Sequence, residues 1–243
     1  MHLLSEEPQS KSLCESCNLQ KQFVFKHLNA EQLRNLSNEI DQVQYSPGKI
    51  IFKQGSAPQG FICLKKGKVK IIRSAPNGND LIIDLKSSPD TLGIRALSTG
   101  SKYNSSAVAL DQVTICLINE NAFHQLLDSS TKMFKELLSY IGDRLVRTDQ
   151  KLISLTQKHV KSRLADTLLN LQQTLGENPD GYIDISLKRS ELAQLSNMTT
   201  ANVIRTLSEL KSMGFIVFKG RNIKIINKKA LTQISEFDNY NVI

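Results

Sequence analysis

The sequence predicts an α+β protein: a β-rich N-terminal half, then a long helix, then a mostly helical part that contains a hairpin. Three observations support this order. Between Val43 and Ile118, short apolar runs alternate with glycine-containing turns. Over Phe134–Leu155, apolar residues recur with a heptad period. Over Ser190–Ile226, two helical patterns precede two short apolar runs.

These changes of pattern divide the 243 residues into five segments. We predict a tail with two cysteines, a β-domain, a dimerisation helix, a helical DNA-binding domain and a second tail, which cover residues 1–22, 23–129, 130–156, 157–231 and 232–243. A helix over about Phe25–Ile40 is expected to open the β-domain, because Leu33, Leu36 and Ile40 share one face. The β-rich runs that follow are Val43–Tyr45, Ile50–Phe52, Phe61–Leu64, Val69–Ile72, Leu81–Leu85, Ser105–Leu110 and Thr114–Ile118. Many short strands with glycine turns are typical of a β-sandwich or barrel.

The long helix carries an apolar seam whose spacings alternate between four and three residues. This period is typical of a coiled coil. The seam consists of Phe134, Leu138, Ile141, Leu145, Thr148, Leu152 and Leu155. Charged residues flank it, whereas a helix that packs only on its own domain needs a wider apolar stripe. We therefore predict a homodimer that pairs through this helix; packing on the chain's own β-domain is the alternative.

Caps and turns mark the helices of the C-terminal domain. A helix over Val160–Leu175 is expected to end at Gly176, and a short strand is expected at Tyr182–Ile185. The next elements are a helix at Ser190–Leu195, a turn at Ser196–Met198, a helix at Thr200–Met213 capped by Thr199, and hairpin strands at Phe215–Phe218 and Ile223–Ile226. A helix, a three-residue turn, a helix and a hairpin together form a winged helix-turn-helix.

The second helix of this motif is the predicted reader of double-stranded DNA, because its N-terminal part enters the major groove. Arg205 is long enough to form two hydrogen bonds with guanine, and Ala201 or Ile204, on the same face as Thr200, can contact a thymine methyl group. The residues expected to bind phosphates are Arg189, Thr199, Asn202, Lys219 and Arg221. The alternative is an ordinary three-helix domain with a solvated basic face.

The positive charge of the chain gathers in the same region. The formal net charge is +8, and the segment from Ser186 to Lys229 contains nine basic residues against two acidic ones. A basic surface attracts polyanions such as DNA.

Several other classes of protein are not indicated by the sequence. No apolar run reaches the roughly 20 residues that span a bilayer, and the N-terminus lacks the basic and apolar regions of a signal peptide. We therefore expect a cytoplasmic protein without a membrane partner. The sequence contains no nucleophile elbow, phosphate-binding loop, dinucleotide-binding glycine motif or zinc-protease motif, so we expect no enzymatic activity.

The combination of these parts, over nearly the whole chain, resembles the Crp/Fnr family of bacterial transcription regulators. Pro47–Gly55, Gly67–Lys70 and Gly93 resemble the glycine pattern of the family's cyclic-nucleotide-binding-type β-roll, and Leu192–Leu207 resembles its recognition unit. The resemblance implies a double-stranded β-roll that senses an effector or a redox signal, a dimerisation helix, a two-fold DNA operator and recruitment of RNA polymerase.

Two departures from the family pattern concern ligands. Family members that bind cyclic AMP use a Gly-Glu-Leu segment for the ribose and an Arg-Ser pair for the phosphate. Here Gly93–Arg95 reads Gly-Ile-Arg, and Ser105 stands where the arginine belongs, so the phosphate would lose its best partner. Cyclic AMP is therefore not the expected effector. Many members also have a glutamate at the position of Ala201, so the operator should differ from the usual family site, although Arg205 matches the family arginine.

The cysteines resemble part of the iron–sulfur site in the oxygen-sensing Fnr branch. Cys14 and Cys17 match the first two of its three N-terminal cysteines, and Cys116 falls at the place of the distant one. The third position reads Phe23, which cannot bind iron, although such a cluster needs four ligands. His27 or an exogenous ligand is the alternative for the missing place. Cys63 is expected to lie too far into the β-roll to take part. A thiol redox switch and the absence of any functional role remain as alternatives, and the four histidines lack the paired spacing that would favour heme.

Two function classes are left open at this point. The first is a DNA-binding regulator whose β-roll controls its dimerisation helix. The second is a ligand-binding regulatory module that acts on a protein partner and leaves its basic winged helix unused. The sequence identifies neither the effector nor the operator, and it does not separate an activator from a repressor.

Overall fold

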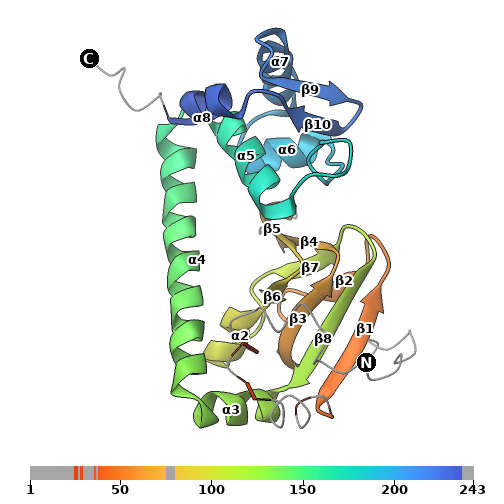
Figure 1. The fold of residues 1–243 in the computed structure, drawn as a ribbon, viewed down its shortest axis with the longest axis vertical. Coiled ribbons are helices and arrows are strands. Elements are labelled where there is room, and N and C mark those ends of the chain that lie inside the picture. Colours follow the sequence, from red (N-terminus) through yellow and green to blue (C-terminus); the bar gives the residue numbers. More distant parts are fainter. Residues whose placement is uncertain (1–24, 27, 30–35, 37, 75–79, 237–243) are drawn as a thin grey trace. The chain divides into compact units, whose positions relative to one another are not determined.

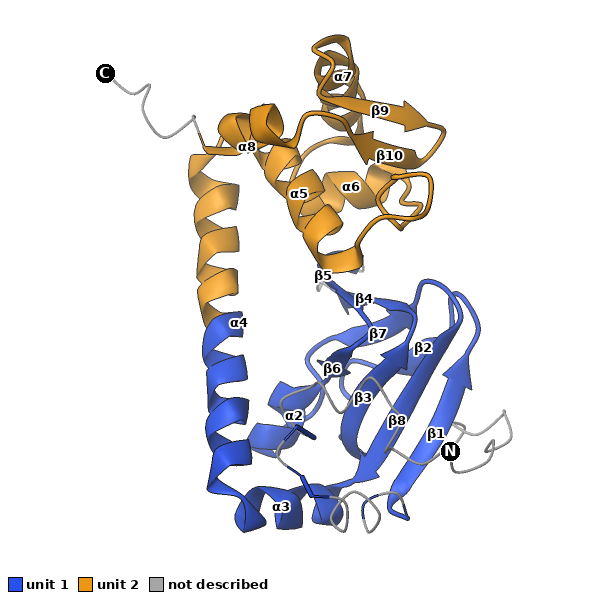
Figure 2. Ribbon diagram, in the orientation of Figure 1, with its two compact units in different colours: residues 1–144 blue, residues 145–243 orange. Residues whose placement is uncertain are grey.

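The computed structural model describes residues 25–236 apart from 27, 30–35, 37 and 75–79, and Figure 1 shows its helices and strands. The chain forms two compact units, Met1–Arg144 and Leu145–Ile243, which Figure 2 colours separately. The boundary lies within one long helix, α4 (Thr131–Gln157). A β-rich part, a long helix and a C-terminal helix-turn-helix follow one another, which confirms the predicted α+β fold class.

Two antiparallel sheets build the described part of the N-terminal unit. Their strand orders are β1-β8-β3-β6 and β2-β7-β4-β5. The strands are β1 (Ile40–Tyr45), β2 (Ile50–Phe52), β3 (Gly60–Lys66), β4 (Lys68–Ser74), β5 (Asp80–Ser87), β6 (Asp90–Leu92), β7 (Ser106–Ala109) and β8 (Val113–Asn119). Because sequence neighbours such as β1 and β2 lie in different sheets, the two sheets are joined into one β-roll.

Strands β3 and β8 lie in the middle of their sheet and are buried on both faces. Ile62 and Leu64 of β3 point into the core that the two sheets share. Phe61 and Cys63 alternate with them and point into a second core on the other face. Residues of α2 (Ile94–Thr99), α3 (Glu120–Ser129) and the first turns of α4 complete this second core.

The strand predictions of the N-terminal unit are confirmed, since each predicted run overlaps an observed strand. The sequence did not reveal β6 or α2, because β6 is three residues long and directly follows Pro89. The predicted helix over Phe25–Ile40 is wrong at its end: Ile40 begins β1 and pairs with Ile118. Leu36 and Ile40 are apolar because both contact the second core. Half of the residues of that predicted helix lie outside the described residues.

The C-terminal unit packs helices around one apolar core. Its further elements are α5 (Val160–Leu175), α6 (Arg189–Ser196), α7 (Thr200–Ser212), β9 (Ile216–Lys219), β10 (Asn222–Ile225) and α8 (Lys228–Glu236). Leu164, Leu168, Leu192, Leu207 and Ile216 are almost completely buried in it. Among the described helices, none is both long and apolar enough to span a bilayer.

The strand expected at Tyr182–Ile185 is not formed. Ile183 makes a single bridge with Glu177, and its amide donates to the carbonyl of Ile223 in β10 (2.8 Å). The side-chain oxygen of Asn178 accepts a hydrogen bond from the backbone amide of Tyr182 (3.0 Å). This bond closes a turn, whereas a longer β-ladder would need extended backbone at this place. Apolar residues at this place therefore dock the segment on the hairpin.

Candidate functional site

Helices α6 and α7 form a helix-turn-helix whose caps are encoded locally. Asn197 ends α6 in the left-handed conformation (φ 50°), which asparagine tolerates better than most residues. Thr199 caps α7, since its hydroxyl accepts the amide of Asn202 (3.2 Å), as predicted. Val203 and Leu207 are buried below, so the opposite side of α7 faces solvent.

The solvent-facing side of α7 brings together the predicted base-reading residues. Thr200, Ala201 and Ile204 are exposed, and the 52% exposure of Ile204 leaves a large apolar side chain without cover. The side chain of Arg205 is 68% exposed. Its guanidinium donates to the Asn202 side chain (3.3 Å) and lies 4.0 Å from Glu209, which holds it along the helix.

The wing is the hairpin β9–β10, and Arg189 connects it to α6. The Arg189 guanidinium donates to the carbonyl of Gly220 at the tip of the wing (2.8 Å) and lies over the ring of Phe218 (5.2 Å). The ammonium of Lys211 lies 4.9 Å from the same ring. Burial lowers the pKa of the Arg189 guanidinium. Arg189 thus orients the wing, while its predicted phosphate contact stays a prediction.

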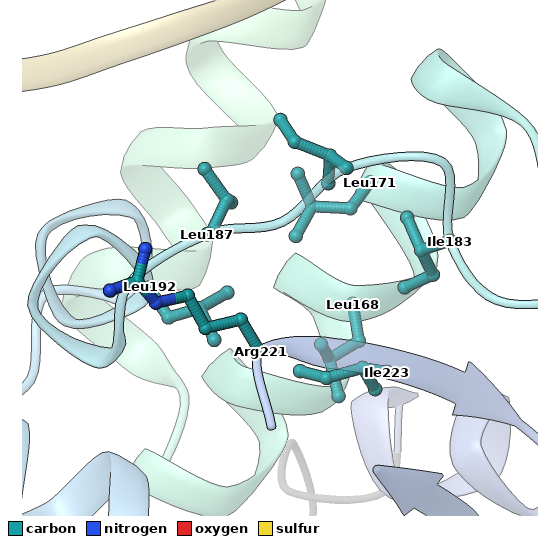
Figure 3. A pocket seen from close by; sticks show the side chains of 8 residues that line it. Leu168, Leu171, Ile183, Leu187, Leu192, Arg221 and Ile223 are labelled. Atoms are coloured by element: carbon teal, nitrogen blue, oxygen red, sulfur yellow. The ribbon is translucent and has the colours of Figure 1, made fainter. Parts of the chain in front are cut away.

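Lys219 and Arg221 lie on either side of the wing tip and are exposed. Arg221 also lines a small apolar pocket together with Leu168, Leu192 and Ile223, as Figure 3 shows. The aliphatic stem of an arginine can cover apolar surface while its charged end stays in water. Both side chains are therefore placed for a ligand that approaches the wing from solvent.

Helix α4 has two faces with different surroundings. The predicted seam is exposed: Phe134 by 54%, Leu138 by 61%, Leu145 by 63% and Leu152 by 61%. The remaining seam residues are the exposed Ile141 and Thr148 and the half-buried Leu155. Large apolar side chains in one exposed stripe indicate an interaction surface.

Two members of this stripe were not predicted from the sequence. Val146 and Ile153 are 54% and 55% exposed, lie seven residues apart and directly follow the seam residues Leu145 and Leu152. Their spacing repeats that of the seam, which is the signal that could have revealed them. The opposite face of α4 supports in part the alternative that this helix packs on the chain's own β-domain, because Met133 and Leu137 are buried in the core of the N-terminal unit.

A buried polar cluster anchors α4 to the β-roll through the hydroxyl of Tyr140. This hydroxyl donates to Asp90 (2.7 Å) and accepts from Lys86 and from Thr91 (both 3.1 Å). Lys86 is only 5% exposed and also pairs with Asp90 (2.7 Å). Buried charges are tolerated only when they are paired. The Tyr140 hydroxyl therefore stabilises the charges of Lys86 and Asp90 and also holds α4 against the β-roll.

Replacing Tyr140 by phenylalanine is expected to lower the free energy of unfolding of the N-terminal unit by about 1–3 kcal/mol, because Lys86 and Asp90 would lose a buried partner. Urea denaturation of the full chain measures this effect. Tyr182→Phe removes a hydroxyl from a ring in the C-terminal unit and serves as the control. Equal stability of Tyr140→Phe and wild type would show that this cluster does not anchor α4.

Three residues at or beside the positions that match the family's cyclic-nucleotide site contact other parts of the β-roll. The hydroxyl of Ser106 accepts a hydrogen bond from the backbone amide of Gln54 (2.9 Å). Tyr103 is 5% exposed, stacks on Phe52 with ring centroids 4.0 Å apart, and its ring contacts Gly93, where a Cβ would collide with it. Burial raises the pKa of Tyr103 to about 12, so it stays a neutral phenol. These placements favour the prediction against cyclic AMP, which stays a prediction.

The cysteines are only partly visible. Cys14 and Cys17 lie outside the described residues, and within the described ranges no group of three histidine, cysteine or acidic residues could hold a metal ion. Cys116 is buried in β8. Strand order places Cys63 directly opposite Cys116. The expectation that Cys63 takes no part in a metal site with Cys14 and Cys17 stays a prediction. His124 lies at the surface 3.7 Å from Glu120.

Comparison with protein families matches both halves of the chain. Residues 42–130 match the model of the cyclic nucleotide-binding domain, and residues 162–234 match that of the Crp-like helix-turn-helix domain.

Relatives of similar length extend these matches over most of the chain. The chain is 24% identical over 212 residues to the CRP-like cAMP-activated global transcriptional regulator of Mycobacterium tuberculosis, covering 86% of this chain and 95% of the relative. It is 22% identical over 226 residues to the fumarate and nitrate reduction regulatory protein of Escherichia coli, covering 91% and 90%. The solved structure of FixK2 from Bradyrhizobium japonicum has the same fold (TM-score 0.71, 19% identity, 80% and 96% coverage).

Proposed function

Because this chain is a DNA-binding transcription regulator of the Crp/Fnr family, we propose that it acts as a homodimer on a two-fold operator. In this proposal α4 pairs with α4 of a second copy along the exposed seam. The proposal rests on the observation that Leu138, Leu145 and Leu152 repeat at seven-residue intervals and are each more than 60% exposed. A two-fold dimer presents two copies of α7, which matches two half-sites in successive major grooves.

Each α7 reads one half-site. Arg205 forms two hydrogen bonds with guanine, for which it releases Asn202 and Glu209. Ala201 or Ile204 contacts a thymine methyl group, and Thr200 lies beside them on the exposed side. The phosphates on both sides are bound by Arg189, Thr199, Asn202, Lys219 and Arg221. The base-reading and phosphate-binding groups thus belong to one surface of the C-terminal unit.

The β-roll supplies the signal that changes DNA binding, either by an effector or by a redox change. The signal must favour one of two arrangements of α4, since a ligand shifts an equilibrium only by its different affinity for two states. The Tyr140 anchor supports α4 as this element, because it connects the helix to β5 and β6. Recruitment of RNA polymerase follows from the family and rests on no residue described above.

A salt titration tests DNA binding against the alternative of a module that acts on a protein. With three cationic phosphate-binding residues in each copy, Arg189, Lys219 and Arg221, log Kobs should fall with log salt with a slope of about −5, or about 10³-fold between roughly 50 and 200 mM. Fluorescence anisotropy with labelled duplex DNA measures the slope.

Matched charge variants show where the phosphates bind. Lys219→Gln combined with Arg221→Gln should make the slope shallower by about 3 to 4, since the dimer loses four contacts. Lys132→Gln combined with Lys135→Gln removes the same charge from α4 and should leave the slope unchanged. A flat salt dependence of the wild-type protein would contradict the assignment of the winged helix to DNA.

A further inference from the structure

Helix α7 has an ion pair with α5 directly beside the base-reading arginine. The ammonium of Lys161 in α5 lies 3.0 Å from Oε2 of Glu209 in α7. The other oxygen of the same carboxylate, Oε1, lies 4.0 Å from Nε of Arg205. The carboxylate of Glu209 therefore lies between two cations, and one of them is the proposed reader of guanine.

The two distances show which cation holds the carboxylate. A separation of 3.0 Å allows a charge-assisted hydrogen bond, whereas 4.0 Å is the outer limit of an ion pair. On a helix, an arginine four residues before a glutamate is also the weaker of the two possible orders for such a pair. Glu209 is thus bound mainly to Lys161, and the side chain of Arg205 remains 68% exposed.

Lys161 reaches Glu209 from a helix start whose position is fixed. It lies in the first turn of α5, soon after the end of α4. Asp166, one to two turns further along α5, accepts a hydrogen bond from the hydroxyl of Ser154 in α4 (2.7 Å) and pairs with Lys158 (3.2 Å). These contacts hold the start of α5 against the end of α4, so the backbone that carries Lys161 has a defined place.

We propose that Lys161 is a positioning residue for DNA reading, because it binds Glu209 and thereby leaves Arg205 available to guanine. The inference rests on the proposed function, since it concerns the same base-reading arginine. Glu209 lies in the last turn of α7, where the helix dipole disfavours an anion. When Lys161 is removed, the ion pair that the structure still describes for this carboxylate is the one with Arg205.

Loss of Lys161 should weaken DNA binding in two ways. Arg205 would be held by a carboxylate that no longer has a second cation, and this pair must break before the guanidinium reaches guanine. The free carboxylate would also add a negative charge near a duplex that carries one charge per ~1.7 Å. The second effect acts on any duplex, but the first acts only on a duplex whose guanine Arg205 reads.

The test measures the affinity of the full-length protein for a duplex selected from random sequences by the wild type and for a scrambled duplex of equal length. The ratio of the two affinities reports base reading, because a change of overall charge affects both duplexes. An exposed ion pair changes an equilibrium constant by a factor of about 1.5 to 5. With two half-sites, Lys161→Gln should therefore lower the ratio by about 2-fold to 30-fold.

Two control variants accompany this measurement. Lys161→Arg keeps a cation opposite Glu209 and should keep the ratio near its wild-type value. Lys229→Gln removes the same charge from the exposed surface of α8 and should also leave the ratio unchanged.

A second substitution separates positioning from a direct DNA contact. Glu209→Gln removes the carboxylate and should by itself give at least the wild-type ratio, and Lys161→Gln combined with Glu209→Gln should regain that ratio. A phosphate contact of Lys161 would instead weaken both duplexes equally and make the salt slope shallower by about 2 for a dimer, with or without Glu209. That result, or a ratio that stays low in the double variant, would overturn the inference.

Failure of this inference is distinguishable from failure of the proposed function. If the wild type selects no duplex and its DNA binding does not depend on salt, the proposed function and this inference both fail. If the wild type prefers the selected duplex, and Arg205→Ala loses that preference while Lys161→Gln keeps it, the DNA-reading function stands and Lys161 has no positioning role.

Discussion

Arg205→Ala is expected to abolish sequence-specific DNA binding while the protein stays folded and dimeric. A bidentate contact with guanine contributes about 1–3 kcal/mol of discrimination. Two half-sites per dimer therefore predict a loss between about 30-fold and 10⁴-fold. The fold should tolerate the change, because the Arg205 side chain is 68% exposed and its contacts with Asn202 and Glu209 lie at the surface of α7.

The measurement uses a duplex selected from random sequences by the wild-type protein and a scrambled duplex of equal length. Arg205→Ala should bind both with nearly the same affinity, since the phosphate contacts remain. Ser208→Ala, one turn further along the exposed side of α7, is the matched control and should keep wild-type selectivity. If Arg205→Ala still prefers the selected duplex to the wild-type extent, the bases are read by other residues.

Leu145→Asp is expected to convert the dimer into monomers. In the proposed dimer, each seam would bury an unpaired carboxylate, which costs several kcal/mol and so shifts association by about 10²-fold or more. Operator affinity should fall with it, because a monomer contacts a single half-site. Leu145 is 63% exposed in the chain by itself, so the fold of the monomer should not change.

Sedimentation over a range of concentrations measures this shift. Arg147→Asp places a carboxylate on the exposed surface of α4 away from the seam and should leave the dimer intact. A dimer of unchanged strength in Leu145→Asp would mean that the apolar stripe of α4 has another partner.

Local signals explain which elements could be predicted from the sequence. Helix α5 was predicted with its observed bounds, because its apolar period lies within the helix and Gly176 directly follows its last residue. The cap at Thr199 and the exposed face of α7 were found for the same reason. These features depend on neighbours within a few positions.

Features that depend on strand order could not be predicted. The opposition of Cys63 and Cys116 follows from β3 pairing with β8, across about fifty residues of intervening chain. The contact of Tyr140 with Asp90 depends in the same way on β6 and α4 lying together. Base and phosphate contacts on α7 remain predictions, because they require DNA.

The burial of β3 and β8 on both faces has a consequence for how the β-roll can respond. These strands also have a hydrogen-bonded neighbour at each edge. Segments held in this way exchange their amide hydrogens only when the whole unit opens, so they behave as the least deformable part of the domain. A stimulus received by this sheet is therefore not expected to move these two strands. Its effect has to pass through side chains at the edge of the sheet, such as Thr91, to elements that are free to shift.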